Sequence, residues 1–254
     1  MNRPRKTVGL YDSCYEHDAC GVGFIVNING RSERKIVANG LQILKNLTHR
    51  GAVGADPKAG DGAGILIQLC YAFFKDKFET ELPDAGQFAI GMFFMPTSPA
   101  GQAETKGVVE RYVLDEGQTI LGWRKVPVNN ANLGESVLPT EPDIWQVAIG
   151  CSNDLTNQDD FERKLFVIRK QIERRIYQSD IKGKSDFYIS SFSSRMINYK
   201  GMLLANQVGE YYPDLLDENM ASSFALVHQR FSPKLALLTG TFLQPNIVCP
   251  SSST

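Results

Sequence analysis

The sequence offers little from which to build a metal centre or a disulfide scaffold. It contains five cysteines in 254 residues, no two of them spaced as Cys-x-x-Cys, and only three histidines. Structural zinc sites need clustered cysteine and histidine ligands, and disulfide scaffolds need a dense set of paired cysteines. We therefore predict no metal site and a reducing compartment, with the cytoplasm as the expected location.

An excess of charge and a long apolar run are also absent. The 27 Lys and Arg residues balance 28 Asp and Glu residues, which leaves a formal net charge of -1. Bulk electrostatics therefore gives no reason to expect a nucleic-acid partner. No window of about 20 apolar residues is present, so we expect no membrane span. The basic residues at positions 3–6 are not followed by the apolar stretch of a secretory signal.

What the sequence does contain is a series of short apolar segments separated by glycine and proline. Runs of apolar and β-branched residues predict strands over 20–28, 65–70, 88–96, 119–128, 143–150 and 223–231. Residues 186–204 predict a hairpin with its turn near residues 193–194 or 199–201. Helical spacing predicts helices over 32–48, 101–115 and 159–179, the last one capped by Asp159 or Asp160. Strands in groups with helices between them indicate an α+β layered domain.

Cys20 is the first candidate for chemistry. It lies at the start of the first predicted strand, in the run Ala19-Cys20-Gly21-Val22-Gly23. A cysteine in such a place is most often a small buried hydrophobic residue. The two glycines favour the functional interpretation, because backbone amides without side chains can approach a ligand closely. Local sequence alone leaves both interpretations open.

Three further segments have a structural and a functional interpretation. Arg50 and Gly51 follow a predicted helix, and they form either its C-terminus with Gly51 as a left-handed cap, or the floor of a pocket. Asp61 and Gly62 precede a strand and form either a simple turn or a pocket loop. Arg230 ends the last predicted strand, where its guanidinium is either a solvated charge or a bidentate partner for a carboxylate.

The joint order of these segments carries a resemblance to a known family. The segments are Leu10-Tyr11-Asp12, then 16–24, 47–53 and 60–66, with 121–128 and 187–202 further along the chain. Together they resemble the start of the glutamate synthase large subunit. That subunit begins with a class II glutamine amidotransferase domain of the N-terminal-nucleophile hydrolase type. The resemblance covers about residues 9–232.

The resemblance implies a fold, a domain division and a site. The fold would be the four-layer αββα sandwich of N-terminal-nucleophile hydrolases, incomplete at the C-terminus. Residues 1–19 would be a propeptide, residues 20–232 a partial amidotransferase domain and residues 233–254 a divergent tail. Cys20 would be the nucleophile that cleaves L-glutamine, with its own α-amino group as the base. Arg230 would bind the substrate's α-carboxylate, and Arg50, Gly51, Asp61 and Gly62 would line the pocket.

The resemblance also implies features of a larger parent enzyme. Its ammonia would pass to a synthase region with FMN and an iron–sulfur cluster, fed by an electron-donating subunit or by ferredoxin. The amidotransferase domain itself would need no cofactor. If the source were a photosynthetic eukaryote, the plastid would replace the cytoplasm as the expected location.

One departure from the family pattern bears on activity. After Arg230 the family has an Asn-Gly pair that supplies the oxyanion hole, and no such pair follows Arg230 here. The loss of one oxyanion donor slows such reactions about 100- to 1000-fold. We therefore expect a truncated or frame-disrupted domain with impaired activity. Two alternatives remain at this point, a non-catalytic module that binds glutamine or a partner, and a related hydrolase that acts on another amide.

Overall fold

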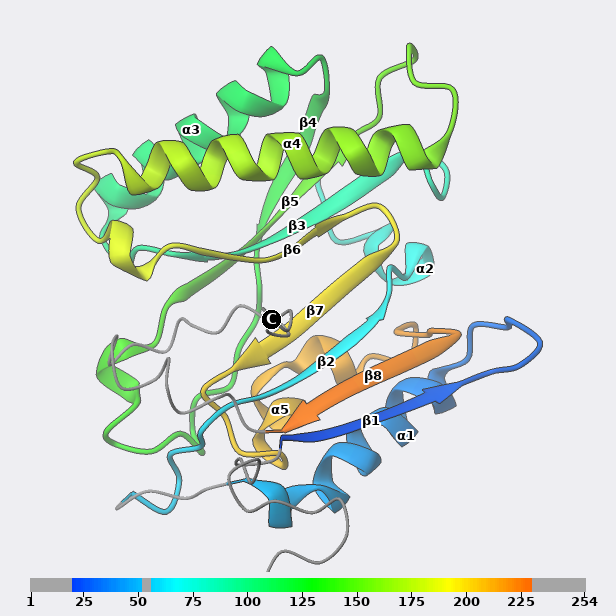
Figure 1. The fold of residues 1–254 in the computed structure, drawn as a ribbon, viewed down its shortest axis with the longest axis vertical. Coiled ribbons are helices and arrows are strands. Elements are labelled where there is room, and N and C mark those ends of the chain that lie inside the picture. Colours follow the sequence, from blue (N-terminus) through cyan, green and yellow to red (C-terminus); the bar gives the residue numbers. More distant parts are fainter. Residues whose placement is uncertain (1–19, 52–55, 230–254) are drawn as a thin grey trace, which may run out of the picture.

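Two four-stranded antiparallel sheets form the centre of the molecule (Figure 1). The structure is a computed structural model that describes residues 20–51 and 56–229. The first sheet has the order β1 (Gly21–Val26), β8 (Phe224–Gln229), β2 (Ala63–Gln68) and β7 (Met196–Gly201). The second has the order β4 (Thr119–Lys125), β5 (Asp143–Gly150), β3 (Phe88–Met95) and β6 (Tyr188–Ser193). Helices combined with antiparallel sheets confirm the predicted α+β class.

Helices α3 (Pro99–Asp115) and α4 (Gln158–Tyr177) lie side by side over one face of the second sheet (Figure 1). The apolar stripe predicted for the second of these helices is fully buried against that sheet, and it consists of Phe161, Leu165, Ile168, Ile172 and Ile176. The predicted cap is wrong. The Asn157 side chain caps α4 by accepting a hydrogen bond from the Asp160 backbone N–H at 2.9 Å. Asp159 and Asp160 occupy the first turn, where the helix dipole favours negative charge.

Helix α1 (Arg34–Asn46) packs on the first sheet. Its glycine, Gly40, is explained by this packing, because a Cβ at that position would lie 2.7 Å from the Cβ of Ala225 in β8. The sequence did not predict the short helices α2 (Tyr71–Phe74) and α5 (Gln207–Tyr211), nor the 3-10 turns at Thr48–Arg50, Leu138–Thr140, Lys184–Asp186 and Pro213–Leu216. Among the described residues, no helix is long and apolar enough to cross a membrane.

The segment predicted as a hairpin joins the two sheets. Its turn lies between Ser193 and Met196, which confirms the first of the two predicted turn positions. The two strands do not form one paired ladder, however, because β6 pairs with β3 in the second sheet and β7 pairs with β2 in the first. The Glu162 carboxylate on α4 holds the turn by accepting hydrogen bonds from the Ser193 and Ser194 hydroxyls and from the Ser194 backbone N–H.

A buried ion pair connects the sheets through their side chains. Arg124 on β4 donates to both carboxylate oxygens of Asp214, at 2.8 and 2.6 Å. The same guanidinium donates to Gln146 on β5 at 2.7 Å, and the Tyr199 hydroxyl of β7 donates to Asp214 at 3.2 Å. The side chains of Arg124 and Asp214 are only 12% and 4% exposed. The network therefore links two strands of the second sheet to the edge strand of the first.

Lys200, near the end of β7, is a lysine with only 5% of its surface exposed. Its Nζ donates to the Tyr188 hydroxyl at 2.5 Å and lies 4.2 Å from the centre of that ring. Burial, together with the nearby charge of Arg169, lowers the pKa of Lys200 to about 7. Protonated Lys200 is therefore an unfavourable group in the folded chain.

The Arg124→Met substitution should destabilise the fold by about 3–5 kcal/mol, because it leaves the Asp214 carboxylate buried and uncompensated. Urea unfolding monitored by circular dichroism would measure the change. The matched control is Arg111→Met, which removes an exposed pair with Asp115 and should cost less than about 1 kcal/mol. Equal effects of the two substitutions would contradict the role assigned to the buried pair.

Lys200→Met should stabilise the chain at neutral pH, and the gain should shrink as the pH rises. Between pH 7 and about pH 10 the unfolded state holds the Lys200 proton more tightly than the folded state, so wild-type stability increases with pH by at most about 1.4 kcal/mol per unit. Urea unfolding over this range would measure the difference between the two proteins. The exposed Lys182→Met should show a difference that does not change with pH, and a constant gain for Lys200→Met would contradict the linkage.

Candidate functional site

The strand register brings the predicted site segments to one end of the first sheet. At this end Gly21 pairs with Gln229, Gln229 pairs with Ala63 on its other side, and Ala63 pairs with Gly201. Cys20 directly precedes β1 here and is exposed. Cys20, Asp61 and Gly62 therefore all lie at the same end of the sheet, although 41 positions separate Cys20 from Asp61 in the sequence.

Arg50 and Gly51 lie against the same end from the side of α1. A Cβ on Gly21 would lie 3.0 Å from the Cβ of Arg50, and a Cβ on Gly51 would lie 2.4 Å from Nε2 of Gln229. The backbone of Gly51 is extended, with φ −80° and ψ 157°. The interpretation of Gly51 as a left-handed helix cap is therefore wrong. Its missing side chain makes room for the end of β8 instead.

The glycines after Cys20 also have a packing role. A Cβ on Gly23 would lie 2.6 Å from a methyl group of Ile43 on α1. Gly23 thus allows the helix to approach β1, which is a simpler reason for the glycine than access to a ligand. Gly21 has the same function toward Arg50.

The glycine-rich loop before β2 is tightly packed. Gly62 is buried and has a φ of 114°, a left-handed conformation that favours glycine. A Cβ on Gly60 would lie 2.2–2.4 Å from the backbone of Leu203 and Leu204. Asp61 is half-buried between these two glycines. The loop thus fixes the backbone of Asp61 two residues before β2 begins.

Arg230 lies outside the described residues, so the structure does not place it. It directly follows Gln229, the last residue of β8. The structure brings the other five predicted residues to one end of the first sheet, namely Cys20, Arg50, Gly51, Asp61 and Gly62. Within the described part of the chain, no group of three or more His, Cys, Asp and Glu side chains is placed to hold a metal ion.

Two residues at this end were not identified from the sequence as site residues. His228 on β8 and Lys200 on β7 both pair with Gly64 of β2, one on each side. Side chains alternate along a strand, so His228 and Lys200 share one face of the sheet with Val22. Burial holds the pKa of His228 below its ordinary value, and the nearby charge of Lys200 adds to this effect. The alternation of side chains along each strand would have placed His228 and Lys200 on one face, but only after the strand pairing was known.

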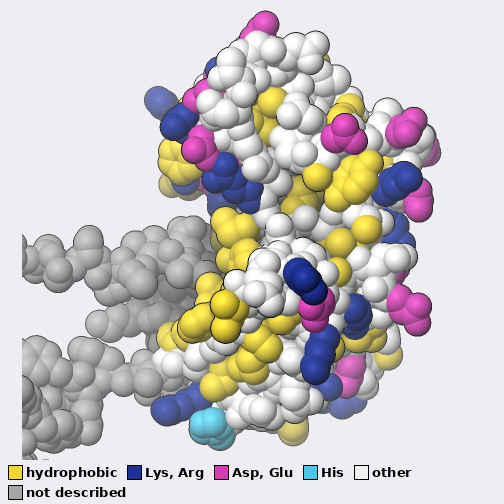
Figure 2. Space-filling view, turned by 90° about the vertical axis from the view of Figure 1, so that its right-hand side faces the viewer, with side chains coloured by type: hydrophobic (Ala, Val, Ile, Leu, Met, Phe, Trp, Pro, Cys, Tyr) yellow, Lys and Arg dark blue, Asp and Glu magenta, His cyan; other side chains and the backbone are white. Residues whose placement is uncertain are grey.

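The sheet face that carries Val22, His228 and Lys200 is exposed to solvent along β1. Val22, Phe24 and Val26 alternate along the strand and are 59%, 71% and 49% exposed. Hydrophobic side chains gather on the lower part of the surface, the part that contains the first sheet (Figure 2). Cys20 precedes Val22 by two positions and therefore comes to the same face.

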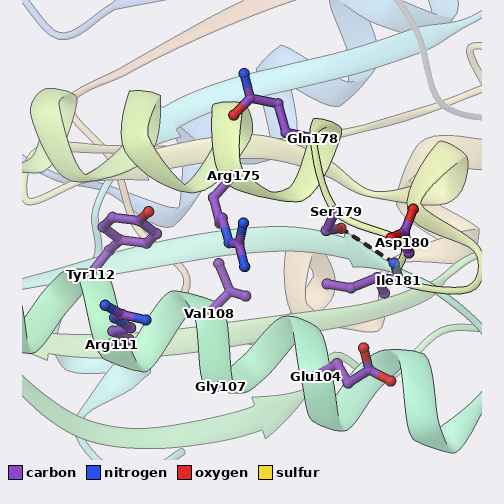
Figure 3. Close-up of a pocket in the computed structure, with 10 residues that line it drawn as sticks. All are labelled: Glu104, Gly107, Val108, Arg111, Tyr112, Arg175, Gln178, Ser179, Asp180 and Ile181. Atoms are coloured by element: carbon purple, nitrogen blue, oxygen red, sulfur yellow. Dashed lines mark hydrogen bonds between the residues drawn. The ribbon is translucent and has the colours of Figure 1, made fainter.

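Two grooves in the structure lie away from this end. One, of about 520 Å³, runs between α3 and α4, and Arg111 and Arg175 approach it from the two helices (Figure 3). The other, of about 490 Å³, lies at the opposite end of the first sheet, where Gln68, Met196 and Phe224 line it. Neither groove is lined by a predicted site residue, so cavity size alone would not have found the Cys20 end.

Comparisons with known proteins agree on one family. Residues 20–236 match the model of the family described as glutamine amidotransferases class-II. The glutamate synthase [NADPH] large chain of Bacillus subtilis is 42% identical over 232 residues, which cover 91% of this chain and 15% of that protein. The corresponding protein of Azospirillum brasilense is 44% identical over 230 residues, 89% of this chain and 15% of the relative.

Relatives with another electron donor in their names also match. Ferredoxin-dependent glutamate synthase 2 of Synechocystis is 37% identical over 220 residues, 85% of this chain and 14% of that protein. The chain thus spans about 15% of the length of the curated relatives it matches. Because the family model covers most of the sequence, from Cys20 to residue 236, the chain belongs to the class-II glutamine amidotransferases.

Proposed function

We propose that the chain is a glutaminase domain in which Cys20 cleaves the side-chain amide of L-glutamine, as the ammonia-producing part of a glutamate synthase. The observation that carries this proposal is the place of Cys20. The family match begins at this residue, and Cys20 is exposed at the end of the sheet to which Arg50, Gly51, Asp61 and Gly62 also come. A nucleophile must be accessible and surrounded by groups that position the substrate.

The chemistry requires a free amino group at Cys20. Removal of residues 1–19 would make Cys20 the first residue, with an α-amino group whose ordinary pKa is about 7.7–8.0. This amine accepts the thiol proton, and the thiolate attacks the amide carbon of glutamine to form a C–S bond. The C–N bond breaks after the nitrogen receives that proton, and ammonia leaves. Water then cleaves the thioester, which releases glutamate and restores the thiol.

The neighbouring groups have binding roles in this proposal. Arg230 grips the α-carboxylate of glutamine through two parallel hydrogen bonds, for which a guanidinium is well shaped. Arg50 and Gly51 form the wall on the side of α1, and the Asp61 carboxylate faces the substrate's α-ammonium group. The two sheets with their helices correspond to the αββα layers of an N-terminal-nucleophile hydrolase.

The proposed domain division and parent enzyme follow from the same proposal. Residues 1–19 are the propeptide, residues 20–232 the amidotransferase domain and residues 233–254 a divergent tail. In the parent enzyme the ammonia reaches a synthase region with FMN and an iron–sulfur cluster, which aminates 2-oxoglutarate. Electrons come from a partner subunit or from ferredoxin.

Purified chain treated with a chloroketone analogue of glutamine should be labelled at Cys20. The Cys20 sulfur displaces chloride, and intact mass with peptide mapping would show both the label and a chain that starts at Cys20. Cys20→Ala should abolish labelling. Cys151→Ala is the matched control and should leave it unchanged, because burial raises the pKa of the Cys151 thiol and keeps it less reactive.

The same samples test the alternatives. Labelling at a cysteine other than Cys20, in a chain that starts at Cys20, would contradict the site. Glutamine binding without any ammonia release from such a chain would favour a binding module. Ammonia release from asparagine as fast as from glutamine would point to a hydrolase of different specificity.

A further inference from the structure

β1 is an edge strand of the first sheet, and in the described part of the chain no strand lies beside its outer edge (Figure 1). Its partner on the inner side is β8, with Gly21 opposite Gln229 and Val26 opposite Phe224. An edge strand presents backbone N–H and C=O groups that can pair with another chain. The reaction proposed above makes no use of this edge.

The hydrogen-bond pattern shows which residues of β1 turn their backbone groups outward. Just beyond β1, the Asn27 backbone N–H donates to the Ser223 carbonyl oxygen at 2.7 Å, in the register of the strand pair. Hydrogen-bonded and non-hydrogen-bonded pairs alternate along an antiparallel ladder. The odd-numbered residues of β1 therefore bond to β8, while Val22, Phe24 and Val26 direct their N–H and C=O groups toward the open edge.

The same three residues carry the exposed apolar side chains of the strand. Val22, Phe24 and Val26 are all exposed, and Phe24 is the most exposed of them at 71%. Leu226, which pairs with Phe24 from β8, is also exposed, so the apolar surface continues onto the next strand. Outward backbone groups and exposed apolar side chains at the same positions are typical of a strand to which a further strand can be added.

β1 has none of the usual features that keep edge strands apart. Residues 20–30 contain no charged residue and no proline. The edge strand β4 of the second sheet differs, because it carries Arg124 and Lys125 and because its register shifts between Ile120 and Gly122. Charges and bulges of this kind protect an edge from association. β1 is therefore open to association where β4 is protected.

The exposed pattern of β1 is complementary to itself. Phe24 is flanked by a valine two positions away on either side, Val22 and Val26. Two copies of the strand, antiparallel about a two-fold axis at Phe24, would place Phe24 opposite Phe24 and Val22 opposite Val26. Each pair would exchange backbone hydrogen bonds, because these are the residues whose groups point outward. Aromatic and β-branched cross-strand pairs stabilise a sheet, and no like charges meet.

The opposite face of β1 also accommodates a second copy. In the same register, Gly23 of one copy lies opposite Ile25 of the other. Ile43 of α1 lies over Gly23, so Ile25 would meet an apolar side chain there. α1 packs over both β1 and β8, through Ile43 and Gly40, which keeps the helix inside the edge of the sheet. Two such helices can lie side by side at about 8–10 Å, the usual distance for packed helices.

We propose that β1 pairs with β1 of a second copy of this chain, antiparallel and centred on Phe24, so that the two first sheets join into one continuous sheet. The occupant of the edge is a second copy because the exposed pattern is symmetric about Phe24 and uncharged, as an isologous interface requires. The inference does not depend on the proposed function. In the dimer the two Cys20 residues lie about 27 Å apart along the strand direction, so each copy keeps its own site.

Sedimentation velocity of the full chain at about 1 to 100 μM would test the proposal. Wild type should change from monomer to dimer as the concentration rises. Phe24→Lys places two ammonium groups opposite each other at the axis and should raise the dimer dissociation constant at least about tenfold. The matched control is Phe166→Lys, which replaces a phenylalanine of α4 that is 60% exposed and should leave the dissociation constant unchanged.

Disulfide trapping would test the register. In a Cys20→Ala background, a chain with Val22→Cys is mixed with a chain with Val26→Cys under mild oxidation. These positions are opposite each other in the proposed register, and the Cα atoms of such a pair lie about 5.5 Å apart, within the reach of a disulfide. Two copies of one variant hold position 22, or position 26, about 14 Å apart and should not link through it. Peptide mapping of the unreduced dimer would identify the linked positions.

Other results would overturn the proposal. A wild-type chain that stays monomeric over the whole range would show that β1 has an occupant other than a second copy. Equal effects of Phe24→Lys and Phe166→Lys would remove β1 from the interface. Linkage of Val22→Cys to itself would exclude the register centred on Phe24. If Phe24→Lys did not fold, the absence of a disulfide in the mixture would be sufficient to reject the proposal. None of these results would affect the labelling of Cys20 that tests the glutaminase proposal.

Discussion

The buried pair of Arg124 and Asp214 is the interaction on which the arrangement of the two sheets depends. The turn between β6 and β7 joins the sheets covalently, and one apolar core contains side chains from both sheets. The Arg124 guanidinium adds a directional link between them, because Asp214 also accepts a hydrogen bond from Tyr199 on β7. Lys200 follows Tyr199 and points to the opposite face. The same strand therefore links the sheets on one face and carries Lys200, which pairs with Gly64, on the other.

Local sequence predicted the elements well and their pairing poorly. The stripe from Phe161 to Ile176 has the helical period and is buried as expected, and all the predicted strands exist. The β6–β7 segment shows the limit. Its two apolar runs and short turn are typical of a hairpin, yet β3 and β2 compete for the two strands and separate them into different sheets. Which partner a strand takes depends on distant residues, and no local pattern contains that information.

The site residues also divide into those that local sequence identifies and those that only the strand pairing brings together. Cys20 was identified because it belongs to a recognisable motif. The strand register then showed that Asp61 and Gly62 lie at the same end of the sheet. His228 and Lys200 were not identified as site residues, and their proximity arises only because both strands pair with Gly64. The two interpretations of Gly51 stayed open for a related reason. Its neighbour Gln229 lies 178 positions away in the sequence, so a helix cap was the simpler local interpretation.

The end of the sheet near Cys20 departs from the rules that make a stable β-protein. Glycines weaken strands, yet Gly21 and Gly64 stand inside β1 and β2, and a lysine is buried where an apolar residue would be more stable. Both departures have one physical consequence. The glycines bring neighbouring backbone and side chains closer than a Cβ would allow, and the sheet keeps His228 and Lys200 on either side of Gly64 at a cost in stability. Such a local conflict between stability and sequence is expected where a surface is shaped for a ligand.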